Sequence, residues 1–442
     1  MPLNTMKKIY FIALAIVTAL SSGCGKGSGG ELVGVRTKKV PTKTIPFGMV
    51  YIPAGSFVMG QTDQDITFAQ IAQNKQVTVQ AFYMDETEIT NSEYRQFVNW
   101  VRDSIAIKDY LQDPNYFIKP KKGAAANAGG PQYIDWKKAR TIWSNKKGSA
   151  ANASKLQAMY YQGDDRIFDK NEIDVRLLKY NLEIMKFREA ANYRGDKTRT
   201  RSDNILRDTV AIYPDTLVWL SDFAYAQNEP LTQGYFSHPA FKNYPVVGVT
   251  WRQARAFTVW RTRLYGSYAA SKKMPEYIRS DYMLPTEAEF EYAARGGRIG
   301  NDYPWGGPYI RNAKGCLMAN FKPGRGNYID DGGAFTVNVK SYFPNDFGLY
   351  NMAGNVAEWT ASAYDESANT FTHDLNPTFN YEAKAGDAEV LKRKSVRGGS
   401  WKDIGYFLQN STRSFEYQDT AKSYIGFRCV SKYQGRDIKD KN

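Results

Sequence analysis

The residues of this chain best suited to bind a metal lie in one stretch, 347–360, which reads FGLYNMAGNVAEWT. Its Gly and Asn residues allow backbone carbonyls to turn inward, and Asn351 and Glu358 add side-chain oxygens. A cage of carbonyl, amide and carboxylate oxygens suits a hard cation such as calcium. The alternative is a tight turn around a buried Trp359 that holds no metal.

Residue counts exclude several other kinds of site. The chain has two histidines, His238 and His373, which are far apart in the sequence and form neither a His-rich metal set nor a Ser/His/Asp spacing. No Gly-rich phosphate loop is present. Asp164, Asp165 and Asp169 lack the Gly and terminal Glu of an EF-hand, so we predict a solvated acidic turn there.

The N-terminus has the pattern of a secretory signal peptide. Two lysines at positions 7–8 precede an apolar run over 9–20 and small residues over 21–23. The apolar run is too short to span a bilayer comfortably. We therefore predict a signal peptide over residues 1–23, which ends just before Cys24.

Small residues that end at a cysteine resemble a bacterial lipobox, although Ser21 stands where a Leu is usual. We predict a lipid on Cys24, and Gly25 in place of an Asp favours the periplasmic face of the outer membrane. The alternative is a secreted protein cut elsewhere. Residues 24–46 read as a lipidated cysteine with a flexible tether, and residues 434–442 as a polar tail.

The chain carries 59 Lys and Arg against 45 Asp and Glu, a formal charge of +14. Because the basic residues are dispersed and no nucleic-acid-binding fingerprint accompanies them, we expect a solvated basic surface and no nucleic-acid partner. The other two cysteines, Cys316 and Cys429, could pair in an oxidising compartment. Two buried free thiols are the alternative.

Three helix starts are marked by a Thr followed three residues later by Glu or Gln, at Thr90, Thr250 and Thr286. In such a capping box each side chain satisfies a free backbone N–H of the first turn. Each box follows an apolar, strand-like run, and residues 48–60 predict two short strands joined by a turn. Together these elements indicate an α+β domain.

The domain is predicted to cover residues 47–433, with an insertion at about 104–236. Residues 119–130 and 144–154 are rich in Lys, Gly, Ala and Asn, which is typical of exposed loops. Apolar residues at helical spacing predict an amphipathic helix over 172–194.

Several motifs resemble one known family. Residues 397–401 read RGGSW and residues 426–429 read GFRC, and both are similar to the signature of the formylglycine-generating enzyme (sulfatase-modifying factor) family. Further motifs match that family in order, at 49–60, 82–98, 244–257, 284–297, 303–306 and 348–360. The resemblance implies an irregular, loop-rich α+β fold that is related to the C-type lectins.

In that family, two reactive cysteines bind copper and oxidise a substrate cysteine. By landmark they would fall on Gly405 and Asn410, inside a segment, 403–414, that reads DIGYFLQNSTRS and contains no cysteine. Glycine and amide groups cannot replace a thiolate as copper ligand or nucleophile. We therefore expect no catalytic residues, no catalytic cofactor and no enzyme activity, as in a pseudoenzyme.

The resemblance also implies two structural calcium sites. The first falls on Asn351, Gly354, Val356 and Glu358, and the second on Asn320, Phe321, Asp331 and Gly333.

Residues 30–35 and 82–98 are in addition similar to gliding-motility lipoproteins of Bacteroidetes. This resemblance implies an outer-membrane-anchored periplasmic structural subunit of the type IX secretion system, which supports protein export and, in gliding species, motility. The implied partners are a GldN-like (PorN-like) periplasmic protein, further copies of the chain in a large ring, and other secretion components. The alternatives are an oxidase of the formylglycine-generating type with altered chemistry, and a lectin or peptide-binding module.

Overall fold

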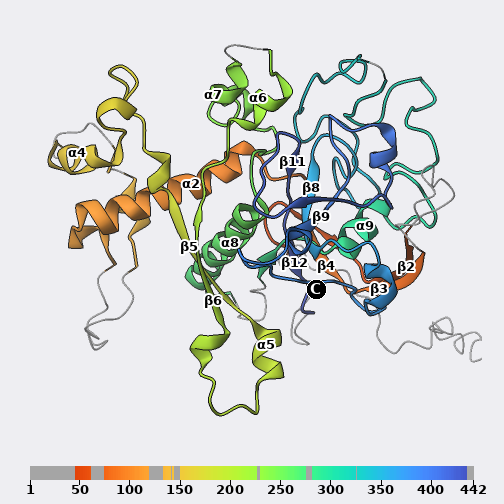
Figure 1. Cartoon of the computed structure of the whole chain (residues 1–442), viewed down its shortest axis with the longest axis horizontal. Coiled ribbons are helices and arrows are strands. Elements are labelled where there is room, and N and C mark those ends of the chain that lie inside the picture. The colour runs from red at the N-terminus through yellow and green to blue at the C-terminus, as the bar shows by residue number, and fades with distance from the viewer. Residues whose placement is uncertain are drawn as a thin grey trace, which may run out of the picture. The chain divides into compact units, whose positions relative to one another are not determined.

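The computed structural model describes residues 45–60, 74–118, 133–140, 142–143, 150–225, 229–274, 281–324 and 326–435 (Figure 1). The predicted signal peptide, the lipid-bearing Cys24, the tether up to residue 44 and the tail from residue 436 lie outside these ranges. Within them, no helix combines the length and apolar character that a membrane crossing requires.

One sheet joins the two ends of the domain. Its strand order is β1 (Met49–Ile52), β4 (Phe82–Asp85), β12 (Val430–Lys432) and β7 (Tyr282–Met283), and every neighbouring pair is antiparallel. The central strand β4 is buried along its whole length. The C-terminal strand β12 therefore closes the core beside strands from the beginning of the domain.

A second sheet carries the two densest sequence motifs. Its order is β10 (Ser414–Tyr417), β9 (Arg393–Arg397), β8 (Ala357–Ala363) and β11 (Ile425–Gly426), and β11 runs parallel to β8. Pairing of β8 with β9 sets Glu358 opposite Arg397, so the two motifs lie side by side.

The two short strands predicted over residues 48–60 are confirmed. Strand β1 pairs with β4, and β2 (Gly55–Met59) pairs with β3 (Lys75–Val79). The strands that cover them come from later in the chain, so the short turn between β1 and β2 does not decide their partners.

The three predicted capping boxes are confirmed. The hydroxyl oxygens of Thr90, Thr250 and Thr286 accept from the third backbone N–H of α2 (Asn91–Ile105), α8 (Trp251–Ser271) and α9 (Glu287–Arg295). Strands β4 and β7 precede α2 and α9, as expected. The run before α8 forms only an isolated bridge from Pro245 to Thr90, so the strand predicted there is wrong.

Helices α2 and α8 pack on each other through aromatic rings in the main core. Tyr94 of α2 stacks on Phe257 of α8 at 5.6 Å between ring centroids, and Phe427 beside β11 meets both rings edge-on. This contact ties the two long helices to the GFRC motif. The mixture of helices and sheets confirms the predicted α+β class.

The amphipathic helix predicted over 172–194 is wrong. Residues 179–185 form β5 (Lys179–Met185), which pairs with β6 (Ile205–Ala211), and only α5 (Phe187–Asn192) is helical. Tyr180 and Leu182 are buried while their neighbours are exposed. This period of two outweighs the looser helical spacing.

The remaining elements are short. Helix α2 continues into a π-helix, η2 (Ala106–Leu111), which packs with α3 (Trp136–Ala139) and α4 (Ala150–Leu156) in a small apolar cluster of its own. Other short helices are α6 (Val218–Asp222), α7 (Pro230–Gly234) and α10 (Ala368–Phe371). The 3-10 turns are Pro114–Tyr116, Gln157–Met159, Gly163–Asp165, Val175–Leu177, Arg201–Asn204, Pro239–Phe241, Glu389–Lys392 and Gly405–Leu408. That residues 104–236 are an insertion, and that the fold is related to the C-type lectins, remain predictions.

The hydroxyl oxygen of Thr250 accepts from the backbone N–H of Gln253 at 3.2 Å. Replacing Thr250 with Ala removes this acceptor. We expect Thr250→Ala to lower the free energy of unfolding by about 1 kcal/mol, measured by urea denaturation. Thr250→Ser keeps the hydroxyl and should stay within a few tenths of a kcal/mol of the unsubstituted protein. Equal losses in the two variants would show that the cap does not stabilise α8.

Candidate functional site

The turn before β8 is built from residues that tolerate left-handed backbone. Asn351, Gly354 and Asn355 have φ values of 49°, 80° and 68°, which Gly and Asn adopt more readily than other residues. A Cβ on Gly354 would lie 2.6 Å from the backbone oxygen of Asn320. Because Asn355 also donates its backbone N–H to that oxygen at 2.7 Å, the turn brings the two predicted calcium sets together.

Glu358, the carboxylate of the first set, is held by an arginine. Arg428 donates from Nε and Nη2 to both carboxylate oxygens, at 2.6 to 3.0 Å, and both side chains are fully buried. Burial raises the pKa of Glu358, and the Arg428 charge opposes that rise. A calcium ion bound by Glu358 would sit beside a guanidinium, so this set fits the ion poorly as arranged.

Asn351 has a second role in the same set. Its amide nitrogen donates to both carboxylate oxygens of Glu88, at 3.1 and 3.2 Å, and to the Val339 carbonyl at 3.1 Å. Asn355 donates to Glu88 as well, at 2.8 Å. Two amides of the motif therefore serve a buried acid that belongs to a distant part of the chain.

Sequence reasoning missed Glu88, which lies just before the α2 capping box. Burial raises its pKa to about 8, with Arg428 opposing the rise and Glu358 adding to it. Asp85 lies nearby and pairs with Arg261 at 2.7 Å. Three buried carboxylates thus share two guanidinium groups. The sequence offered no signal, because Glu88 stands in a polar run, 85–92, that reads DETEITNS.

The second predicted calcium set fits a cation better. The Asp331 carboxylate accepts from the backbone N–H groups of Phe321, at 2.6 Å, and Gly333, at 3.0 Å, and burial raises its pKa. The Asn320 amide nitrogen donates to the Phe335 carbonyl at 2.8 Å. Its oxygen is buried and accepts no hydrogen bond within the described ranges.

An unpaired amide oxygen near a half-buried carboxylate is the kind of donor set that calcium prefers. A Cβ on Gly333 would lie 3.0 Å from the Asn320 oxygen, so a glycine keeps the space beside that oxygen open. If calcium binds, Asn320, Asp331 and the carbonyls of Phe321 and Gly333 would hold it, and its charge would tie the two loops together. Both calcium assignments remain predictions.

The signature segment 403–414 is anchored from both sides. Arg397, at the end of β9, is fully buried and donates to the backbone oxygens of Asn410, at 2.7 Å, and Ser411, at 3.1 Å. Its guanidinium also pairs with Glu287 and Glu291 of α9. Arg413 binds Glu287 through two hydrogen bonds of 2.6 and 3.0 Å. Burial alone would raise the pKa of Glu287, but Arg413 and Arg397 hold it below its ordinary value.

The two landmark positions inside that segment are packed. Gly405 opens a 3-10 turn, and a Cβ added there would meet Ile310 and Phe321 at ordinary contact distances. Asn410 donates its backbone N–H to Asp302 at 2.7 Å and its amide to Asn301 at 3.1 Å. The segment is thus bound to the loop around residues 301–310.

A small, open hollow is lined in part by this loop, through Pro304 and Trp305. Its lining includes Trp305, Met318, Phe343 and the backbone turn at Asn351 and Met352. Trp305 stacks on Tyr303 with the rings nearly parallel and their centroids 5.1 Å apart. The first predicted calcium set therefore borders an aromatic hollow.

The cysteines and histidines form no site in the described part of the chain. Cys316 is exposed and Cys429 is buried, and neither is in a disulfide, so a pair of buried thiols was the wrong picture for Cys316. Burial raises the pKa of the Cys429 thiol. The side chains of His238 and His373 accept from nearby backbone N–H groups. No cluster of three or more His, Cys, Asp or Glu residues is arranged for a metal within these ranges.

Comparison with known proteins now adds the family. The sulfatase-modifying factor enzyme 1-like domain (FGE-sulfatase) matches residues 36–433. The chain belongs to this family. The mouse formylglycine-generating enzyme is 26% identical over 397 residues, which are 87% of this chain and 74% of the mouse protein. The cattle inactive C-alpha-formylglycine-generating enzyme 2 is 34% identical over 194 residues, 42% of this chain and 50% of that protein.

Among solved structures, PvdO from Pseudomonas aeruginosa aligns over 87% of this chain and 94% of its own, at 17% identity and a TM-score of 0.45.

The expectation that the chain is not an enzyme is wrong as it was drawn. Its relatives in the sulfatase-modifying factor family include proteins named formylglycine-generating enzymes, with an inactive form beside them. The missing thiols argue only against a reaction that needs a thiolate at those positions. They do not exclude other chemistry on the same fold.

The buried arginine of the family signature can be tested against a surface arginine. Arg397→Met leaves Glu287 and Glu291 short of a counter-charge, and we expect it to lower the free energy of unfolding by about 3–5 kcal/mol. Arg207 pairs with Glu183 at 3.4 Å, with both side chains more than half exposed. Arg207→Met should cost less than about 1 kcal/mol in the same denaturation experiment. Similar losses would contradict a structural role for the buried network.

Lys394 of β9 gives a pH-dependent prediction. Its ammonium donates to the Tyr381 carbonyl and lies 4.1 Å from the Trp251 ring, and burial, aided by Arg255, lowers its pKa from 10.5 to about 8. Between these values the unfolded chain binds the proton more tightly, so stability rises with pH from about 8 towards 10, by up to about 1.4 kcal/mol per pH unit. Below pH 8 both states are protonated and the contribution is constant.

Lys394→Met lacks this titration. Urea unfolding of both proteins at pH 7, 8, 9 and 10 should therefore show the stability difference growing in favour of the unsubstituted protein above pH 8. Parallel pH profiles would refute the assignment.

Proposed function

We propose that this chain is a periplasmic component of the type IX secretion system, anchored to the outer membrane by a lipid on Cys24. Its similarity at residues 30–35 and 82–98 is to the gliding-motility lipoprotein GldK, called PorK in non-gliding species. In this role it assembles with a GldN-like (PorN-like) protein, and with further copies of itself, into a large ring that supports protein export and gliding.

The observation that carries the proposal is a contrast between a run that builds the core of the domain and segments that are exposed. The run 82–98 forms β4, the buried Glu88 site and the start of α2, so it builds the core of the family domain. Residues 160–174 and 186–201, by contrast, are mostly exposed and lie outside the family motifs. A subunit of an assembly needs such surface in addition to its own fold.

Two contacts of one side chain, Tyr180, support this interpretation. The β5–β6 hairpin is fixed at its root by Tyr180, whose ring lies 5.3 Å from Phe97 of α2 and whose hydroxyl accepts from Arg263 of α8 at 3.1 Å. The chain thus holds an exposed hairpin firmly on its core. Calcium at Asn320 and Asp331 would, in this proposal, stiffen the same core.

Detergent extraction of the tagged chain, followed by mass measurement and identification of co-purifying proteins, tests the proposal. We expect a particle far heavier than the 50.1 kDa chain, with one abundant periplasmic partner, and loss of protein secretion when the gene is deleted. A monomer without a stoichiometric partner, or unchanged secretion in the deletion strain, would refute it.

The lipid anchor has its own test. Labelling with a palmitate analogue should mark the unsubstituted chain and leave Cys24→Ser unlabelled, with Cys316→Ser as the matched control that keeps the label. Equal labelling of the two cysteine variants would place the lipid elsewhere.

The relatives named formylglycine-generating enzymes favour a second candidate, an oxidase with altered chemistry. Stoichiometric copper(I) binding, or conversion of a Cys-containing peptide, would support it. Neither result would by itself exclude a role in assembly, because the segment 403–414 and the exposed structures within residues 104–225 are separate parts of the chain.

A further inference from the structure

Two exposed structures of opposite charge extend from the region 104–225. The acidic loop, residues 160–174, carries five acidic and two basic side chains, a net charge of −3. The basic tip, residues 186–201, carries six basic and two acidic side chains, a net charge of +4. Both are therefore strongly charged for their length.

Each structure also exposes large apolar side chains among its charges. In the acidic loop Ile167 is 61% exposed and Phe168 is 87% exposed, the latter held at a φ of 50°. In the basic tip Phe187 is 74% exposed, and Tyr193 lies under the Arg199 guanidinium at 3.6 Å. Apolar side chains surrounded by charge are typical of a contact surface for another protein.

Most of these charges form no ion pair with another described residue. Asp164 and Asp169 form no ion pair with a described residue, and neither do the basic-tip residues Arg188, Arg194, Lys197 and Arg201. Asp165 does pair, with Arg176 at 2.7 Å. The unpaired groups leave each surface free to attract the opposite sign.

Both structures are rigid where they leave the core. The acidic loop is closed by the bridge from Tyr160 to Ile173 and by Arg176, which binds Asp165 and Asp174. The basic tip is closed at the end of the β5–β6 hairpin, where Lys186 donates its backbone N–H to Asn204 at 2.8 Å. Surfaces that are ordered beforehand lose less entropy on binding.

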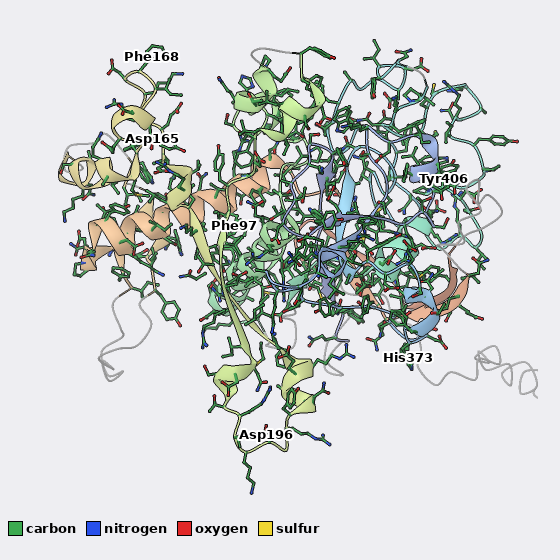
Figure 2. All side chains as sticks on the ribbon, in the orientation of Figure 1. Phe97, Asp165, Phe168, Asp196, His373 and Tyr406 are labelled. Atoms are coloured by element: carbon green, nitrogen blue, oxygen red, sulfur yellow. The ribbon has the colours of Figure 1, made fainter. Side chains whose placement is uncertain are left out.

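The two structures cannot meet within one chain. Figure 2 shows Phe168 of the acidic loop near the top of the view and Asp196 of the basic tip at its bottom, well apart from each other. A contact between them therefore joins one copy to the next, head to tail. Unless two copies pair reciprocally, such a contact leaves a free acidic loop and a free basic tip at the two ends until a ring closes.

From this complementarity we infer that the acidic loop of one copy binds the basic tip of a second copy. The inference rests on the proposed function, which requires self-association, and names the surfaces that make it. Ion pairs form between the carboxylates of Asp164 and Asp169 and the basic side chains of Arg194 and Lys197, around a centre of Phe168 and Phe187.

Charge reversal of the full-length chain, extracted in detergent, tests the inference by sedimentation over a range of protein concentrations. Arg194→Glu with Lys197→Glu lowers the net charge of the basic tip from +4 to 0, and Asp164→Lys with Asp169→Lys raises that of the acidic loop from −3 to +1. Each pair of substitutions thus sets like charges against each other at the four positions inferred to form ion pairs. We expect each pair of substitutions to weaken self-association at least about tenfold. Raising the salt concentration should weaken the unsubstituted assembly as well.

Restoration is the decisive part of the experiment. The chain with all four substitutions has the signs at the four paired positions exchanged, and we expect it to assemble within about threefold of the unsubstituted protein. An equimolar mixture of the chains with one substituted surface each should also assemble, because the four positions then face opposite charges at every contact between the two kinds of chain. Lys272→Glu with Lys314→Glu is the control, since it changes the net charge equally at exposed sites outside both structures.

Three results would overturn the inference. Assembly that survives both reversals places the contact elsewhere, and so does a four-substitution chain that stays dissociated while its circular dichroism is unchanged. Loss of assembly on reversal of the basic tip alone, with the acidic loop indifferent, assigns that tip to another anionic partner such as a lipid surface. If the unsubstituted chain itself forms no large particle, the proposed function and the inference both fail. If it forms one that the substitutions do not affect, only the inference fails.

Discussion

The pair of Arg428 with Glu358 is the interaction on which the rest of the core depends. Arg428 lies between β11 of one sheet and β12 of the other, and it binds Glu358 of β8 while donating to the Asp85 carbonyl of β4 at 3.2 Å. Because removal of one partner would strand a buried charge, the two sheets are held in one relative position. The Glu88 site is built against the same guanidinium.

The RGGSW motif, which begins at the end of the neighbouring strand β9, joins distant parts of the chain in a similar way. Arg397 joins α9 to the segment 403–414, and Gly399 passes so close to the Phe407 backbone that a Cβ would lie 2.7 Å from its oxygen. Both halves of the family signature thus contribute an arginine that is buried with carboxylates from elsewhere. Charge placed this way resists substitution, because neither partner can change alone without leaving the other unpaired.

Local features of the fold could be predicted from the sequence, whereas features that depend on distant partners could not. The three capping boxes lie within four residues each and were found from spacing alone. The two short strands at 48–60 were predicted as well, whereas their pairing with β4 and β3 was not. The Glu88 site was not predicted because the amides that donate to it, those of Asn351 and Asn355, are 263 and 267 residues away in the sequence. The helix predicted over 172–194 was wrong because residues there fit both a helical spacing and the period of two of a strand.

The contacts that hold the family signature and the exposed charged segments belong to different parts of this family member, so one can change without the other. The segment 403–414 is positioned by Arg397 and Arg413 through its backbone and its flanks, which holds whatever side chains stand at Gly405 and Asn410. The exposed structures at 160–174 and 186–201 make none of those contacts. The absence of a cysteine from the segment therefore bears on one reaction and leaves these contacts intact.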